Sequence, residues 1–147
     1  MKKQYSLNKY ASAINRLSLR FYDLSLRDYH IGGGQQFFLV RIYENQGIGV
    51  MELAQRGYFD KATATRAIQK LEEQGYIRRE SAPEDKRASR LYTTKKAEPI
   101  IERIYESAHK WNQVLTQDMS KDEMLKAEQL MARIAKNAHE YINHVRE

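Results

Sequence analysis

The sequence contains no cysteine, and only two of its 147 residues are proline. Without cysteine, disulfide bonds, thiolate metal sites and thiol-based redox sensing are all excluded. Two prolines and seven glycines are too few for a low-complexity chain, and a composition of 41% hydrophobic and 30% charged residues is typical of a globular protein. At this length we expect one domain, or two small domains packed together.

Long apolar runs are missing as well. No stretch approaches the roughly 18 apolar residues of a membrane span, and the N-terminal segment MKKQYSLNKYASA lacks the apolar centre of a signal peptide. We therefore expect a cytoplasmic protein with no membrane partner.

Positive charge is concentrated in one quarter of the chain. Segment 61–96 carries ten basic and five acidic residues, a net charge of +5, so the other 111 residues share only +1 of the total of +6. Lysine and arginine gain free energy by releasing counterions from a phosphate backbone, so this segment indicates a surface that binds a polyanion. A solvated surface that is basic by chance is the alternative at this point.

Long amphipathic helices are predicted at both ends of the chain. Apolar residues spaced alternately three and four apart run through 7–24, 97–115 and 124–145. These helices could pack on each other as an antiparallel bundle within one chain. We favour a homodimer, because the same helices cannot easily cover a separate middle domain and also bury all of their own apolar faces.

Local motifs set the limits of these helices. The glycine run IGGGQ at 31–35 is expected to end the first helix, and a shorter helix follows through Phe37 and Tyr43 and ends near Gly47. The motif SKDE at 120–123 predicts a capping box, in which Ser120 and Glu123 bond each other's backbone N–H, so the last helix should start near Lys121.

The middle of the chain predicts two consecutive helices with a tight connection. The first runs from about Val50 to Arg56, and Gly57 can end it. Asp60 is an N-cap residue for the second helix, and Gly75 can close it. One face of the second helix is apolar, and this face comprises Ala64, Ala67, Ile68 and Leu71.

The opposite face of the second helix has the chemistry of base readout. Arginine binds guanine through two hydrogen bonds, glutamine pairs with adenine, and threonine contacts phosphate or a thymine methyl group. Thr63, Arg66 and Gln69 are accordingly the candidates for contacts to bases, with Lys61, Thr65 and Lys70 beside them. An ordinary solvated helix face is the alternative.

The segment after the second helix favours the DNA interpretation. Residues 77–81 and 88–93 are predicted as two short strands, and the connecting segment contains Pro83, whose fixed φ suits a turn. Helix, turn, helix and a basic hairpin together predict a winged helix-turn-helix. Arg78, Arg79 and Arg90 are expected to bind phosphates.

The chain resembles the MarR family of transcriptional regulators over most of its length. The resemblance rests on ELAQRGYFDKATATRAIQKLEEQGYIRR, on the wing EDKRASRLYTT and on the helices at both ends. Asp85, Lys86 and Arg87, at their distance before Thr93, match the family's D-x-R wing. The resemblance implies that Arg87 enters the minor groove and that Asp85 orients its guanidinium group.

The sequence departs from the family pattern at several positions. Thr93 stands where the family usually has leucine, and Ala97 stands where it usually has glycine. Gly57 and Phe59 replace a larger and a smaller apolar residue, which suggests a compensated exchange of volume. Pro99 would remove a backbone donor from a helix that begins near residue 94, unless that helix starts late.

The resemblance also implies a small aromatic or anionic effector that binds between the dimerisation helices and the DNA-binding lobe and weakens operator binding. The candidates on the helices that would line such a cleft are Tyr10, Arg16, Tyr22, Tyr105, His109 and Trp111. No catalytic motif is present, so we expect no enzyme activity and no cofactor. Glu140 and His144 lie four residues apart near His139, but solvated surface residues explain them better than a metal site does.

The sequence thus predicts a mainly α fold with a small β-hairpin. Residues 1–30 and 94–147 are expected to form dimerisation helices around a winged helix-turn-helix lobe at 31–93. The function that follows is a homodimeric transcriptional regulator, such as a repressor, that binds a pseudo-palindromic DNA site. The alternatives are a winged-helix adaptor for an acidic protein partner and an RNA-binding protein.

Overall fold

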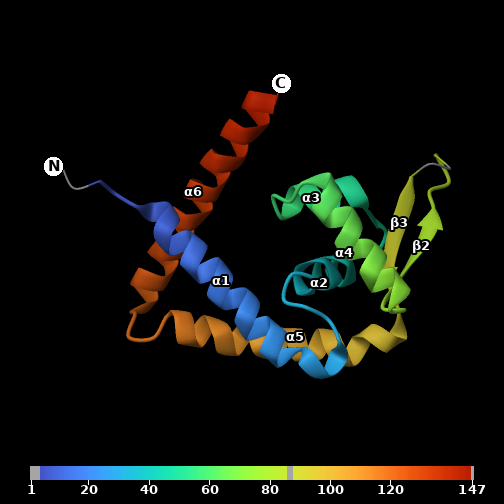
Figure 1. Cartoon of the computed structure of the whole chain (residues 1–147), viewed down its shortest axis with the longest axis horizontal. Helices are drawn as coiled ribbons and strands as arrows, with labels where there is room; N and C mark the ends of the chain where they lie inside the picture. Colours follow the sequence, from blue (N-terminus) through green and yellow to red (C-terminus); the bar gives the residue numbers. More distant parts are fainter. Residues whose placement is uncertain (1–3, 86–87, 147) are drawn as a thin grey trace. The chain divides into compact units, whose positions relative to one another are not determined.

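The computed structural model describes residues 4–85 and 88–146, and it confirms a mainly α fold with a small sheet. Residues 1–111 and 112–147 form two compact units. The elements in chain order are α1 (Leu7–Ser25), η1 (Arg27–Tyr29), α2 (Gln36–Glu44), β1 (Ile48–Gly49), α3 (Val50–Arg56), α4 (Lys61–Glu73), β2 (Ile77–Ser81), β3 (Ser89–Thr93), η2 (Lys95–Ala97), α5 (Glu98–Leu115) and α6 (Lys121–Arg146) (Figure 1).

The glycine run does not end α1, contrary to the prediction. The helix ends at Ser25, before a turn of 3-10 helix in which His30 takes a left-handed conformation with φ of 58°. Gly33 instead lies directly against α1, where an added Cβ would come within 2.6 Å of the Leu19 carbonyl oxygen. The glycine at 33 is therefore required for close packing rather than for stopping a helix.

The helix-turn-helix forms at the predicted limits. Gly57 is the C-cap of α3, and the Asp60 side chain accepts a hydrogen bond from the Thr63 backbone N–H at the start of α4. Gly75, with φ of 79°, follows the end of α4. Ala64, Ile68 and Leu71 are buried, as the apolar face of the second helix predicted.

The sheet has one strand more than the sequence suggested. Its order is β1-β3-β2, with β3 in the centre and both pairings antiparallel. The two residues of β1 were missed because a strand of this length has no periodic pattern. Ile48 in β1 lies opposite Leu91 in β3, and both side chains are buried in the core. The hairpin of β2 and β3 projects beyond α4 (Figure 1).

Aromatic rings fill the core beside the helix-turn-helix connection. Phe59 lies 4.6 Å from Phe38 and 5.2 Å from Phe37 between ring centroids. An added Cβ at Gly57 would lie 2.6 Å from atoms of both Phe37 and Phe59. The larger ring at 59 thus occupies the space that a side chain at 57 would need, which agrees with a compensated exchange of volume.

We expect Gly57→Ala to lower the free energy of unfolding by about 1–2 kcal/mol, because the rings must move to admit a methyl group. Shortening Phe59 to leucine in the same chain frees that space, so the double variant should be more stable than the sum of the single changes predicts. Urea denaturation of the three variants measures this coupling. Strict additivity would show that Gly57 and Phe59 are not packed as described.

The junction between the wing and α5 accommodates Pro99. A turn of 3-10 helix precedes α5, which begins only at Glu98, so Pro99 lies in the first turn of the helix. Backbone N–H groups in the first turn have no partner within the helix, so the missing donor costs little there. The polar groups of Thr93 also have hydrogen-bond partners. Its backbone N–H donates to Gln46 Oε1, and its hydroxyl oxygen accepts from Gln46 Nε2.

The second unit confirms the capping box. The Ser120 backbone N–H donates to Glu123 Oε1, and the Glu123 backbone N–H donates to Ser120 Oγ, both at 3.1 Å. Large apolar side chains on α6 are exposed, namely Leu125, Leu130, Met131, Ile134, Tyr141, Ile142 and Val145. On α1, Leu7, Tyr10, Leu17, Leu19 and Leu24 are exposed in the same way. Both helices therefore present apolar surface to solvent.

Candidate nucleic-acid interface

The outward face of α4 carries half of the predicted contacts to DNA. Lys61, Thr65, Arg66, Gln69 and Lys70 are exposed, and Thr63 is partly buried. The buried residues of α4 hold the opposite face against the core, which fixes the direction of these side chains. The structure thus brings the six predicted residues of this helix onto one accessible surface.

Hydrogen bonds within α4 arrange several of these side chains. The Thr65 hydroxyl group donates to the Lys61 carbonyl oxygen at 2.7 Å, which leaves its methyl group free for an apolar contact. Arg66 donates to the Thr63 hydroxyl group, and Gln69 donates to Glu73, each at 3.4 Å. Contacts of this length are weak, so bases can replace them.

The sheet separates Arg78, Arg79 and Arg90 of the hairpin. The register places Arg78 opposite Tyr92 and Glu80 opposite Arg90, so these four side chains share the sheet face that points away from the core. Arg79 lies on the other face, where its Nε donates to Glu72 of α4 at 3.1 Å. Arg79 is therefore beside α4, whereas Arg78 and Arg90 are carried by the outer face of the wing.

Each of these arginines has a carboxylate partner. Arg78 pairs with Glu80 and lies over the Tyr92 ring, 4.6 Å from its centroid. Arg90 Nη2 contacts both carboxylate oxygens of Glu84, at 2.8 and 3.0 Å. The sequence did not predict these partners: Arg78 and Glu80 lie two residues apart in β2, whereas Glu72 and Glu84 reach their arginines from α4 and from the turn of the hairpin.

The wing tip is only partly within the described residues. Ala82 and Ala88 close the base of the turn with a backbone hydrogen bond of 3.0 Å, and the Asp85 backbone N–H donates to the Ala82 carbonyl oxygen at 3.3 Å. Lys86 and Arg87, two of the predicted DNA contacts, lie outside the described residues, and so does the predicted minor-groove contact of Arg87. The implied pairing of Asp85 with Arg87 stays a prediction.

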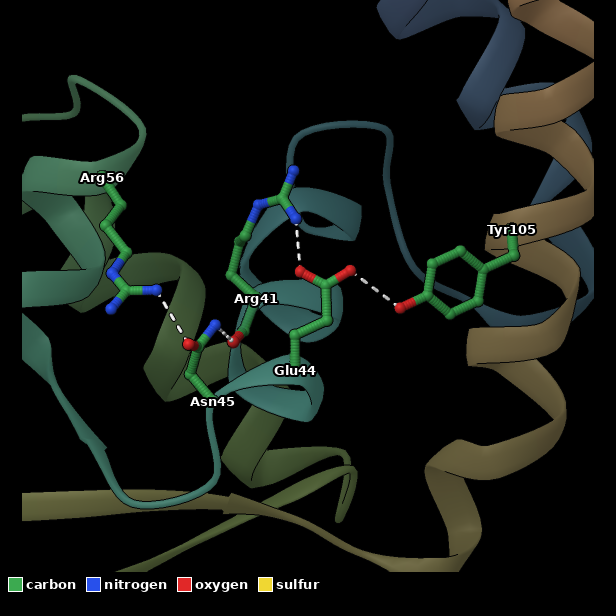
Figure 2. Close-up of polar contacts among 5 residues, drawn as sticks. All are labelled: Arg41, Glu44, Asn45, Arg56 and Tyr105. Atoms are coloured by element: carbon green, nitrogen blue, oxygen red, sulfur yellow. Dashed lines mark hydrogen bonds and ion pairs between the residues drawn. The ribbon is translucent and has the colours of Figure 1, made fainter.

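A polar network connects α5, α2 and α3 behind the helix-turn-helix (Figure 2). The Tyr105 hydroxyl group donates to Glu44 Oε1 at 2.9 Å, and Arg41 binds the other oxygen of the same carboxylate. Asn45 donates to the Arg41 carbonyl oxygen at 2.9 Å and accepts from Arg56, at the end of α3, at 2.8 Å. Burial and the Glu44 hydrogen bond raise the pKa of Tyr105 to about 12, so the hydroxyl group stays protonated as the donor.

The effector candidates do not form one site in the first unit. Tyr22 is buried in the core, and Trp111 stacks on Phe21 and donates to the Ser18 hydroxyl group at 2.8 Å. The exposed members of the set are Tyr10, Arg16, Tyr105 and His109. Tyr105 lines a groove of about 310 Å³, together with Tyr43, Glu98, Ile101 and Glu102.

In residues 4–85 and 88–146, no group of three or more histidine or acidic side chains is placed to hold a metal ion. Over the same residues, none of the helices combines the length and apolar character needed to span a membrane.

A small three-stranded sheet adjoins the helix-turn-helix, and the second helix exposes basic and amide side chains. This combination defines the class of winged helix-turn-helix DNA-binding proteins. A model of the MarR family matches residues 34–89. The HTH-type transcriptional regulator YybA of Bacillus subtilis (strain 168) is 31% identical over 115 residues, which cover 78% of this chain and 77% of YybA.

Solved structures agree with this relationship. The crystal structure of the transcriptional regulator SlyA superposes with a TM-score of 0.91 at 30% identity and covers 96% of this chain and 99% of SlyA. A MarR family regulator from Listeria monocytogenes, complexed with 26mer DNA, has the same fold with a TM-score of 0.91 at 24% identity, over 97% and 95% of the two chains. The chain belongs to the MarR family of transcriptional regulators.

Proposed function

We propose that the protein acts in the cytoplasm as a homodimer that inserts α4 of each protomer into a major groove of a pseudo-palindromic DNA site. The observation that carries this proposal is the outward face of α4, where Lys61, Arg66 and Lys70 are exposed. None of the three forms an ion pair within the described part of the chain. Cations without acidic partners can contact phosphates and base edges without first breaking an ion pair.

The side chains of this face divide into two roles. Thr63, Arg66 and Gln69 lie within two turns of the helix and carry the donors and acceptors that read bases in the major groove. Lys61 and Lys70 flank them and hold the helix in register by contacting phosphates, and the methyl group of Thr65 is available to a thymine methyl group. Arg79 of β2, which contacts Glu72 near the end of α4, extends the phosphate contacts along the backbone.

The hairpin then lies over the flanking minor groove. Arg78 and Arg90 hold phosphates from its outer face, and Arg87 enters the groove with Asp85 as its partner, as in the family. The Listeria protein of the same fold, which was crystallised with a 26mer DNA, supports the proposal that this chain binds double-stranded DNA. We place the DNA-binding lobe at 31–93.

The exposed apolar faces of α1 and α6 support the homodimer. Leucine, isoleucine and methionine in rows along a helix gain free energy when another helix covers them. We assign residues 1–30 and 94–147 to dimerisation. Two-fold symmetry then requires two half-sites about one helical turn of DNA apart, near 34 Å.

An effector that weakens DNA binding fits the groove lined by Tyr105. Two tyrosine rings can stack on an aromatic molecule there, and the groove adjoins the Glu44 network that reaches α3. Glu98 and Glu102 in its lining disfavour an anion at this position. An aromatic effector without negative charge is the better fit.

Selection of bound duplexes from a random pool tests the function. A recovered palindrome with half-sites one helical turn apart is the expected result. Titration of that duplex at several salt concentrations should give a steep fall of log K with log salt, because phosphate contacts release counterions. Recovery of no preferred sequence, with tight binding to RNA or to an acidic protein, would favour the alternative functions instead.

Sedimentation of the isolated protein tests the dimer separately. A dimer at micromolar concentration is expected. A monomer at that concentration would contradict the symmetric site while leaving DNA binding by one protomer open to test.

A further inference from the structure

The turn at the end of α4, residues 74–76, contacts both segments that connect the DNA-binding lobe to the flanking helices. On the N-terminal side, Gln74 Nε2 donates to the His30 carbonyl oxygen at 2.6 Å. The buried Tyr76 donates from its hydroxyl group to the Tyr29 carbonyl oxygen at 2.9 Å. The segment between α1 and α2 is therefore bonded to the end of the helix that carries the base-reading candidates.

The segment between β3 and α5 bonds the same turn from the C-terminal side. Lys96 Nζ donates to the Gln74 carbonyl oxygen at 2.7 Å. The Thr94 hydroxyl group donates to the Gly75 carbonyl oxygen at 2.7 Å, and the Thr94 backbone N–H donates to the Tyr76 carbonyl oxygen at 3.0 Å. Both connections of the lobe thus meet at three consecutive residues, and Gln74 contacts each of them.

The Gln74 side chain is also linked to α1 through Gln35. Gln35 Nε2 donates to Gln74 Oε1 at 3.2 Å, and Gln35 Oε1 accepts from the Gly32 backbone N–H at 2.9 Å. The next residue, Gly33, donates from its backbone N–H to Asp23 Oδ1 of α1 at 2.5 Å. Gln35 is 6% exposed, and a buried amide whose oxygen and nitrogen are both paired is held in one orientation. Hydrogen bonds therefore run from α1 through this connection to the end of α4.

These hydrogen bonds specify a direction for the lobe that its apolar contacts do not. Tyr22 of α1, Ile68 of α4 and Ile104 of α5 belong to one apolar core. Burial of apolar surface is not directional, whereas a hydrogen bond weakens steeply when its angle changes. We therefore expect the contacts of the 74–76 turn to decide the angle between the lobe and α1.

We propose that Gln74 is a positioning residue, which fixes the direction of the DNA-binding lobe relative to α1 and so sets the separation of the two α4 helices in the homodimer. This inference rests on the proposed homodimer on two half-sites. A dimer whose lobes are held in one direction seats both α4 helices only where the half-sites have the matching separation. Loss of the Gln74 contacts lets each lobe take several directions, so the match becomes less exact.

Gln74→Met is the direct test, because it keeps the length of the side chain and removes the amide group. Binding is measured by fluorescence anisotropy with the selected operator, with the operator carrying one extra base pair at its centre, and with a single half-site. The wild-type protein selects the operator, so the half-site separation of the operator matches the direction in which the lobes are held.

We expect Gln74→Met to weaken operator binding about fivefold, because binding must then restore the lost order of the lobes. Binding to the half-site and to the insertion duplex should change by less than about twofold, since a rigid dimer seats only one protomer on either of them. The preference for the operator over the insertion duplex should shrink accordingly. An equal loss on all three duplexes would overturn the proposal, because Gln74 would then act within one protomer.

Gln46→Met is the matched control. Gln46 makes two side-chain hydrogen bonds to Thr93, so this variant removes an amide with as many contacts, but both partners lie within the lobe. We expect the preference for the operator over the insertion duplex to stay unchanged. The same decrease of this preference in Gln46→Met would overturn the proposal in favour of a general loosening of the lobe.

Tyr76→Phe provides a second variant that keeps the buried ring and removes only the hydrogen bond to Tyr29. It should reduce the preference for the operator in the same direction as Gln74→Met does. A wild-type preference that survives both variants unchanged would refute only the role of this turn. Failure of the proposed function gives a different result, because the wild-type protein would then bind the operator and the insertion duplex equally.

Discussion

Gly33→Ala should lower the free energy of unfolding by about 3 kcal/mol, near the upper end of the range for overpacking. A Cβ at this position would lie 2.6 Å from the Leu19 carbonyl oxygen and 3.1 Å from the Leu19 Cα. Both are backbone atoms of α1, so no side-chain rotation can relieve the contact. The chain after η1 would have to move away from α1.

That movement would also loosen two hydrogen bonds in this segment. The Gly33 backbone N–H donates to Asp23 Oδ1 of α1 at 2.5 Å, and the Gly32 backbone N–H donates to Gln35 Oε1 at 2.9 Å. Gln35 is 6% exposed and precedes α2, so the strain reaches the helix that supports the DNA-binding lobe. Urea denaturation measures the loss through the midpoint at an unchanged m-value.

Gly34→Ala is the matched control for this prediction. An added Cβ at Gly34 has no neighbour within 4 Å, and its backbone is not in the left-handed region. We expect a change within about 0.5 kcal/mol, as for exposed positions without special features. Equal losses for the two variants would show that the flexibility of the glycine run matters, rather than the close approach at Gly33.

Local signals explain what the sequence could predict. The Asp60 N-cap, the C-cap at Gly57 and the Ser120–Glu123 box act through neighbours within four residues, so their spacing alone identifies helix ends. The limits of α3 and of β2 accordingly agree with the structure. The exposed face of α4 was predictable for the same reason, because one helix carries all of its side chains.

Contacts between distant segments explain what the sequence could not predict. The close approach of Gly33 to Leu19 and the ring packing around Gly57 depend on how elements meet, and no spacing rule encodes them. The same holds for Glu84 and Arg90, whose contact requires the hairpin register. The effector candidates were chosen by helix alone, and Tyr22 and Trp111 prove to be packing residues of the first unit.

Arg66→Ala should reduce operator affinity about 10- to 100-fold and relax the sequence preference at one position of each half-site. Arg66 is exposed in the centre of the outward face of α4, and its contact with Thr63 is weak. Its guanidinium group is therefore free to bind the O6 and N7 atoms of a guanine. Anisotropy titrations against the operator and its single-base variants measure both effects.

Lys70→Ala separates base reading from phosphate binding on the same helix. If Lys70 contacts a phosphate, its loss should lower affinity for all duplexes equally and reduce the salt slope by about one, without changing the sequence preference. Arg27→Ala, an exposed arginine on η1, controls for the loss of one positive charge and should leave binding unchanged. If Arg66→Ala also weakens every duplex equally, Arg66 binds phosphate, and the bases are read by Thr63 and Gln69 instead.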